Sequence, residues 1–216
     1  KAMVNLQNEK YSEAKFIFES INSRAPLSNE AIKSQLMIGF IHYINLDYQS
    51  AILSFDRLIN KYPAYNDIDY AYYMKAMCYY EQIENDELDG QMNNEALRSF
   101  KKIVNRFPNS EYSKDSLQKI IAIKENIASK HMNIGFFYLN QQKYFAALNR
   151  FKRVVEDHSK SKFVPEALYR LLEIYYKLGM IEDAEKIASV IGYNYPKTRW
   201  YEYSYKLVGE KEEEEK

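Results

Sequence analysis

The stretch Tyr48-Gln-Ser-Ala51-Ile-Leu-Ser-Phe55 decides the fold, because its alanine and the large residue four positions later belong to a repeated pattern. The alanine position repeats at intervals of 37, 45, 51 and 37 residues, and the large, aliphatic and closing proline positions keep the same intervals. The copies are Tyr11–Phe18, Tyr48–Phe55, Asn94–Phe100, Tyr144–Phe151 and Glu182–Ala188. Agreement among four positions indicates one structural unit repeated five times.

A pair of helices is the unit that this pattern predicts. A small residue such as Ala51 lets two helices approach closely, and Phe55 fills the next layer on the same helix face. A proline or, once, a serine closes each copy, at Pro26, Pro63, Pro108, Ser159 and Pro196. A preceding helix is indicated by small or apolar residues twelve positions before the alanine, such as Gly39, Gly135 and Leu172. The pattern resembles the tetratricopeptide repeat (TPR), so the expected fold is all-α, a solenoid of five helix pairs with a concave groove.

The composition agrees with a helical protein that binds other proteins. The chain has 216 residues, 46% of them hydrophobic, and only six Gly and five Pro, which leaves little material for hairpin turns. Because 30 basic residues balance 30 acidic ones, a nucleic-acid footprint is not expected. No apolar run reaches the roughly 18 to 20 residues that a membrane-spanning helix needs.

Two departures from regular spacing predict a loop and a long helix. Pair three has 20 residues between Ala76 and Ala96 where its siblings have 12, so residues 84–91 are expected to form an acidic surface loop. The interval from Pro108 to Gly135 has 14 residues more than its counterpart, close to four helical turns. One helix is therefore expected over 113–140, with a stripe formed by Leu117, Ile120, Ile121, Ile123 and Ile127. The resulting divisions are 1–110, 111–208 and a charged tail, 209–216, expected to be disordered or frayed.

The first helix of each pair is expected to line the groove. The candidate peptide-binding residues are Phe40, Tyr43, Tyr70, Tyr73, Met77 and Tyr80, with Met132, Phe136 and Leu139 in pair four. Tyrosine, at 21 residues, is abundant, and it offers large contact area with a hydrogen bond at low entropic cost. The alternative, that these residues only pack between helices, has equal weight for each of them.

Chemistry other than binding is not indicated. Three histidines stand far apart, no nucleophile has an orienting partner, and no phosphate loop is present, so neither catalytic residues, metal nor cofactor is expected. The single cysteine, Cys78, is expected to be a buried, inert residue. A co-chaperone TPR that clamps carboxylates would need Lys and Asn in the groove, where this chain has Leu36 and Phe40.

Several phrases resemble the BamD family of outer-membrane assembly lipoproteins, over about Ala2 to Gly209. They are Asn66–Met74, Phe107–Tyr112, Lys124–Ala128 and Ala146–Arg150. The chain departs from the family pattern in two ways: its pair-three loop is shorter than family members often carry, and the family's lipidated cysteine is absent. The resemblance implies a non-enzymatic subunit of the β-barrel assembly machinery on the periplasmic face of the outer membrane. Membrane attachment is then expected only through an N-terminal lipid anchor that this chain lacks.

The resemblance also implies partners for each block. The N-terminal repeats (1–110) would recognise C-terminal targeting segments of unfolded outer-membrane proteins, and an aromatic end would suit Phe40, Tyr43, Tyr73 and Met77. The C-terminal repeats (111–208) would hold the last POTRA domain of BamA, and other Bam lipoproteins are expected partners. The alternative is a generic periplasmic or cytosolic TPR adaptor for another protein, which a lipobox cysteine upstream in the gene would disfavour.

The predicted BamA contacts are Asn149, Arg150 and Arg153. Asn149 and Arg150 match the Asn-Arg position of the family. Four residues after Lys152 and Arg153 stand Glu156 and Asp157, so both cations are expected to form ion pairs within the helix, whereas Arg150 has no such partner. An unpaired cation is free to meet a carboxylate on another protein, although a plain solvated arginine is equally compatible with the pattern.

Overall fold

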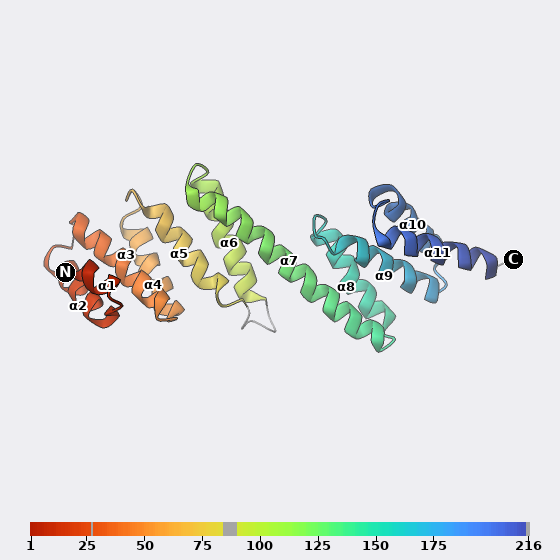
Figure 1. Ribbon diagram of the computed structural model, residues 1–216, viewed down its shortest axis with the longest axis horizontal. Coiled ribbons are helices and arrows are strands. Elements are labelled where there is room, and N and C mark those ends of the chain that lie inside the picture. The colour runs from red at the N-terminus through yellow and green to blue at the C-terminus, as the bar shows by residue number, and fades with distance from the viewer. Residues whose placement is uncertain (27, 84–89, 215–216) are drawn as a thin grey trace. The chain divides into compact units, whose positions relative to one another are not determined.

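The computed structural model describes residues 1–26, 28–83 and 90–214, with side chains as far as residue 210, and every regular element in these ranges is a helix (Figure 1). The elements are α1 (Ala2–Gln7), α2 (Tyr11–Arg24), α3 (Asn29–Ile44), α4 (Tyr48–Lys61), α5 (Ile68–Tyr80), α6 (Gln91–Arg106), α7 (Glu111–Asn140), α8 (Tyr144–Asp157), α9 (Val164–Lys177), α10 (Ile181–Asn194) and α11 (Arg199–Glu214). The predicted all-α solenoid of TPR-like pairs is therefore confirmed.

The helices form two compact units, Lys1–Ile121 and Ala122–Lys216, whose boundary falls inside α7. In the first unit neighbouring helices pack in chain order: α1 on α2, α2 on α3, α3 on α4, α4 on α5 and α5 on α6. In the second unit α9 contacts α8, α10 and α11. Most of this packing is therefore between helices adjacent in the sequence, as expected for stacked repeats.

The repeated alanine and phenylalanine positions form the core. The five alanines, Ala14, Ala51, Ala96, Ala147 and Ala184, are all fully buried. Behind them lie Phe55, Phe100 and Phe151, each with no exposed surface. In pair five the sizes are exchanged: fully buried Leu172 stands at the glycine position and Ala188 at the phenylalanine position.

The predicted helix ends are confirmed. The second helix of each pair stops two residues before its closing residue, as α4 does at Lys61 before Pro63 and α8 does at Asp157 before Ser159. In the four copies closed by proline, its ring would clash with the carbonyl four residues earlier, and the residue before it avoids helical backbone angles, so the chain leaves the helix just upstream. Ser159 places no such constraint on α8, which ends at the same position of the repeat.

Positive-φ residues make the turns inside the pairs. Glu9, Leu46, Gln142 and Gly179 have φ of 58°, 59°, 57° and 70°, and each stands five residues before the alanine of its copy. This left-handed conformation costs little for glycine but is unfavourable for residues that have a Cβ. The periodic turn is therefore imposed by the packing of the helices.

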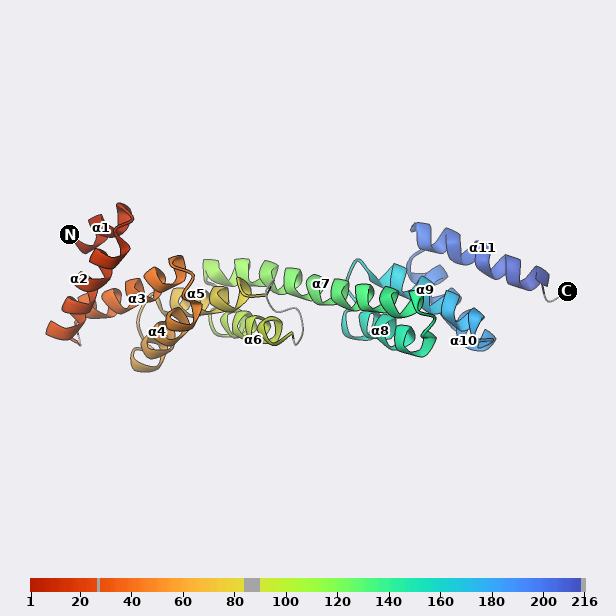
Figure 2. The same ribbon diagram turned by 90° about the horizontal axis from the view of Figure 1, so that it is seen from below.

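A single long helix, as predicted for 113–140, is present as α7, which runs without a break from Glu111 (Figure 2). The predicted apolar stripe is partly wrong. Ile120 and Ile123 are buried, but Leu117 is 46% and Ile121 is 55% exposed. At about 100° per residue, positions 117 and 121 lie on a different face from 120 and 123. The predicted loop 84–91 lies largely outside the described residues, which resume at Gly90.

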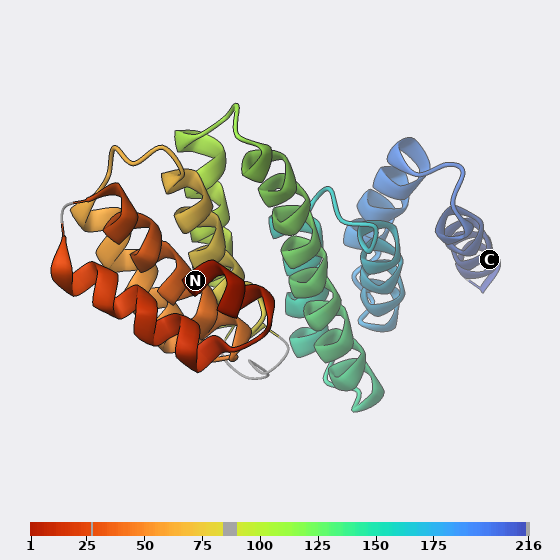
Figure 3. The ribbon, with the colours of Figure 1, turned by 60° about the vertical axis from the view of Figure 1, so that its left-hand side comes forward.

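The tail predicted for 209–216 is helical as far as it is described: α11, the last helix of the chain in Figure 3, runs to Glu214. Contacts with α9 and α10 hold this helix in the second unit. The helix is anchored earlier by Ser204, which is 3% exposed, and by the packing of Tyr201 and Leu207 on the second unit's core. Lysine and glutamate are good helix formers, so the backbone can extend past the last packed turn.

A candidate aromatic recognition surface and a basic helix face

The predicted groove residues occupy two neighbouring helices of the first unit. Phe40 and Tyr43 are on α3, and Tyr70, Tyr73, Met77 and Tyr80 are on α5, which contacts α3. All six are half-buried, so each packs against the protein on one side and keeps some surface open. In pair four, however, Met132 is only 2% exposed and belongs to the core, so its predicted place in the groove is wrong.

Two of these tyrosines have their hydroxyl groups fixed by carboxylates. Tyr43 donates to Glu81 at 3.3 Å, and Tyr73 donates to Asp115 at 2.6 Å. Burial raises the pKa of both phenols, and the adjacent carboxylates raise it further. The phenols therefore stay protonated, and the rings are held in one orientation instead of turning freely.

The first turns of α7 complete the surface. The ring of Tyr112 lies 5.3 Å from that of Tyr70 and 5.1 Å from that of Tyr73, centroid to centroid. The ammonium of Lys119 sits 4.6 Å from the centre of the Tyr80 ring. Tyr112, Asp115 and Lys119 were not expected from the sequence pattern, although their spacing of three and four residues places them on one helix face.

Two of the tyrosine rings on α5 pack against the same core residue. Phe100 of α6 lies 6.2 Å from Tyr73 and 6.1 Å from Tyr80, so these two tyrosines rest on the fully buried repeat position. Tyr43 packs edge to face with Tyr48, with the ring centroids 5.8 Å apart. Phe40 on α3 and Met77 on α5 make no ring contact with these tyrosines within the described ranges. The continuous part of the surface is therefore Tyr70, Tyr73, Tyr80 and Tyr112, which we call the tyrosine row.

The predicted BamA contacts lie on α8 in the second unit. Asn149 and Arg153 are exposed and Arg150 is half-buried. Their surroundings include His131, whose pKa is lowered by burial first and then by the charges of Arg150 and Arg153. The His131 ring, on α7, is 6.1 Å from the ring of His158, the residue that follows the last residue of α8.

The ion pairs predicted on α8 are not formed. Described ion pairs of the second unit include Arg170 with Glu166 and Glu173, and Lys186 with Asp183, but none joins Lys152 to Glu156 or Arg153 to Asp157. Lys152 instead lies 5.8 Å from the Tyr175 ring. Because Arg153 lacks the expected carboxylate, Arg150 is not singled out as the one unpaired cation on this helix.

Cys78 is buried as predicted. It has no exposed surface, and burial raises the pKa of its thiol to about 12, so the reactive thiolate is scarce at neutral pH. The described residues contain no group of three His, Cys, Asp or Glu side chains placed to hold a metal ion. Of the described helices, none is both long and apolar enough to cross a bilayer.

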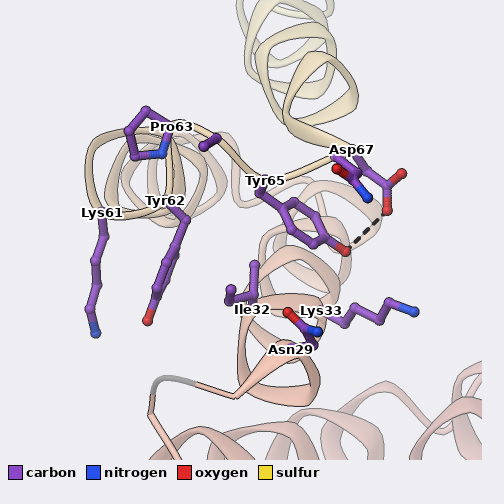
Figure 4. A pocket seen from close by; sticks show the side chains of 10 residues that line it. Asn29, Ile32, Lys33, Lys61, Tyr62, Pro63, Tyr65 and Asp67 are labelled. Atoms are coloured by element: carbon purple, nitrogen blue, oxygen red, sulfur yellow. Dashed lines mark hydrogen bonds between the residues drawn. The ribbon is translucent and has the colours of Figure 1, made fainter.

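A separate pocket of about 560 Å³ lies beside the α4–α5 turn (Figure 4). Tyr62 and Tyr65 face it, with Ile32 and Lys33 of α3 opposite, and Tyr65 donates to Asp67 at 3.0 Å. The pocket contains none of the predicted groove residues. It is a feature of the solenoid edge, distinct from the tyrosine row.

Known proteins resemble the chain over most of its length. A family model described as YfiO, outer membrane lipoprotein, matches residues 1–190. The outer membrane protein assembly factor BamD of Caulobacter vibrioides is 38% identical over 205 residues, which cover 95% of this chain and 67% of that protein. BamD of Rickettsia prowazekii is 36% identical, with 96% and 83% covered. A solved TPR protein of Thermus thermophilus is 18% identical with a TM-score of 0.40, covering 95% and 94% of the two chains.

Proposed function

This chain belongs to the BamD family of outer membrane protein assembly factors, and we propose that it recognises unfolded outer-membrane proteins and binds BamA. The names of its relatives are those of an assembly factor, not of an enzyme. The match of the family model to residues 1–190 carries the proposal, because it includes both proposed surfaces.

The tyrosine row with Phe40, Tyr43 and Met77 is the proposed surface for a client's C-terminal targeting segment. An aromatic residue at the end of such a segment can pack edge to face against tyrosine rings whose orientation is already fixed. The hydrogen bonds to Glu81 and Asp115 support this role, since a preorganised surface loses little entropy when a peptide binds.

Fluorescence anisotropy of a labelled C-terminal peptide from an outer-membrane protein of the same organism tests this surface. Tyr73→Ala should weaken binding at least tenfold, as should replacing the peptide's terminal aromatic residue by alanine. Tyr193→Ala is the matched control, because Tyr193 is 87% exposed in the second unit. Equal affinities of the Tyr73 and Tyr193 variants would reject the tyrosine row as the client site.

Asn149, Arg150 and Arg153 are the proposed contacts for the last POTRA domain of BamA. Arg150 and Arg153 have no carboxylate partner within the described second unit, so both can pair with acidic residues of another protein. A guanidinium can hold a carboxylate through two parallel hydrogen bonds, which gives orientation as well as affinity.

Calorimetric titration with the isolated POTRA domain tests this contact. Arg150→Glu and Arg153→Glu should each weaken binding at least tenfold, because each replaces an attraction by a repulsion. Lys160→Glu makes the same charge change at an exposed position of the second unit and serves as control. Unchanged affinity in both arginine variants would remove α8 from the interface, and failure of the folded wild-type chain to bind would reject BamA as a partner and favour a generic TPR adaptor.

The proposed location is the periplasmic face of the outer membrane, with attachment through an N-terminal lipid anchor and with other Bam lipoproteins as further partners. The family model's description as an outer membrane lipoprotein supports this placement. Fractionation of cells that express the full-length gene, with and without a candidate lipidated cysteine, tests it. Release from the membrane fraction on removal of that cysteine is the expected result.

A further inference from the structure

A basic cleft lies along α6, with Lys75 of α5 in its lining, and contains no residue of the tyrosine row. It has a volume of about 650 Å³, within the range of small-ligand sites. Its lining combines five cations, one carboxylate and two neutral polar residues: Lys75, Arg98, Lys101, Lys102, Arg106, Glu95, Ser99 and Asn105. This is a strong local excess of positive charge in a chain whose formal net charge is zero.

The carboxylates at the cleft are already occupied. Glu95 pairs with Arg98 at 2.5 Å, and Asp56 of α4 pairs with Lys75 at the same distance. The remaining cations, Lys101, Lys102 and Arg106, have no carboxylate partner among the described residues. Lys102 and Arg106 stand four residues apart on one helix, a spacing at which like charges repel.

One tyrosine holds two of these cations in place. The Lys102 ammonium lies 5.0 Å and the Arg106 guanidinium 5.2 Å from the centre of the Tyr72 ring. Arg106 Nη1 also donates to the Tyr72 hydroxyl at 2.7 Å. Tyr72 is only 6% exposed, so the ring is a rigid platform. Arg106 has five N–H donors, and this bond leaves most of them available to an anion.

We propose that this cleft binds phosphoryl groups, with Lys101, Lys102 and Arg106 supplying charge and Ser99 and Asn105 supplying neutral donors. A phosphoryl group presents several oxygen acceptors and at least one negative charge, so it can engage a guanidinium fork, ammonium groups and hydroxyl or amide donors together. A carboxylate ligand has only two oxygens, so it would satisfy fewer of these donors. The protein's own acidic side chains nearby, Glu95 and Asp56, are paired with Arg98 and Lys75 and leave the other three cations without a partner. The donor set therefore fits phosphate better than an acidic peptide.

Two sources carry this chemistry: the headgroups of anionic phospholipids and free phosphate compounds. Flotation of the whole chain with phosphatidylcholine vesicles, with and without phosphatidylglycerol, measures the first. Calorimetry with inorganic pyrophosphate measures the second. Binding in either arm that depends on the cleft supports the proposal, and the arm that responds identifies the source.

The diagnostic variant replaces Lys101, Lys102 and Arg106 together by glutamine. At about fivefold per cation near an anionic surface, affinity should fall roughly a hundredfold. The control replaces Lys143, Lys160 and Lys206 by glutamine, which removes the same charge from exposed positions of the second unit. Equal losses in the two triple variants would mean non-specific attraction and would overturn the proposal, as would absence of binding in both arms.

Folding and ligand class are checked separately. Lys102 and Arg106 contact Tyr72, so the single variant Lys101→Gln, which removes no contact to that ring, tests the site without disturbing the core. It should weaken binding about fivefold, and unchanged affinity in this variant counts against the proposal. Cleft-dependent binding of a polyglutamate peptide without any binding of phosphatidylglycerol or pyrophosphate would overturn the phosphoryl assignment in favour of an acidic protein segment.

Discussion

Gly39 lies directly against the ring of Phe55: a Cβ built on this glycine would fall 2.7 Å from Phe55 Cε1. The same relationship recurs in pair four, where a Cβ on Gly135 would fall 2.6 Å from Phe151 Cε1. Both rings are fully buried, so neither can swing into solvent to make room. The glycines thus set how closely the two helices of a pair approach.

Gly39→Ala is therefore expected to destabilise the protein, although alanine is the better helix former by about 1 kcal/mol. Overpacking a closed core costs about 1–3 kcal/mol, so a net loss of about 1 kcal/mol should appear in urea unfolding. Adding Phe55→Leu should recover part of it. Gly192→Ala is the control, because its nearest neighbour, Tyr201, is 3.8 Å away, and it should stabilise the fold. A stabilising Gly39→Ala would contradict the close contact.

Leu46→Gly should stabilise the protein. Leu46 has a φ of 59° in the turn of pair two and is 70% exposed, so its side chain contributes little packing to offset the strained backbone. Relief of that strain should raise the unfolding free energy by about 1 kcal/mol, measured by thermal and urea unfolding. The reverse change at the equivalent turn, Gly179→Ala, should lower the unfolding free energy. A loss of stability in Leu46→Gly together with a gain in Gly179→Ala would refute the turn geometry.

Tyr112→Ala should weaken client-peptide binding as strongly as Tyr73→Ala, at least tenfold, because Tyr112 packs on both Tyr70 and Tyr73. Anisotropy titrations of the two variants, with circular dichroism to confirm helix content, make the comparison. Tyr73→Phe keeps the ring but loses the bond to Asp115, so a smaller loss is expected. If Tyr112→Ala bound like wild type, α7 would not belong to the recognition surface.

The second unit should lose stability in mild acid. Burial lowers the pKa of both His131 and His158, and their Nδ1 atoms are buried without a partner within the described chain. The charged neighbours are Arg150, Arg153 and Asp157 around His131, and Lys124, Glu125 and Asp157 around His158.

A base whose pKa is lowered by folding stabilises the native state above its unfolded pKa of about 6.5. That stabilisation is lost as the pH falls through the folded value, so the urea midpoint should drop between about pH 7.5 and about pH 5.5. His131→Gln should flatten this dependence. An equal slope in wild type and variant would show that other groups control the acid response.

The fold could be predicted from the sequence because the residues that indicate helix ends and helix pairs lie close together along the chain. Helix ends follow from Pro63 and its counterparts, and helix pairing follows from the spacing of residues such as Gly39 and Ala51. The face of a long helix was harder to assign. Leu117 and Ile121 are apolar but lie off the buried stripe, and composition cannot distinguish them from Ile120 and Ile123.

The site was less predictable, because it depends on contacts between distant segments. The half-buried state of Tyr70 and Tyr73 agrees with the repeat register. Tyr112 and Asp115 meet them across about 40 residues of chain, and no spacing rule connects the two segments. Similarly, a spacing of four residues made an Arg153–Asp157 pair reasonable, yet exposed ion pairs contribute so little energy that side-chain entropy readily prevents them.

The exchange of sizes in pair five has a consequence for how the chain folds. A helix carrying Leu172 cannot accept a helix carrying Phe55, because two large groups would need the same space, and Gly39 opposite Ala188 would leave a void. Repeat proteins are prone to swapping equivalent elements between copies during folding. In this chain the large and small residues of a helix pair fit only each other. This steric matching disfavours an exchange of helices between pair five and the other pairs during folding.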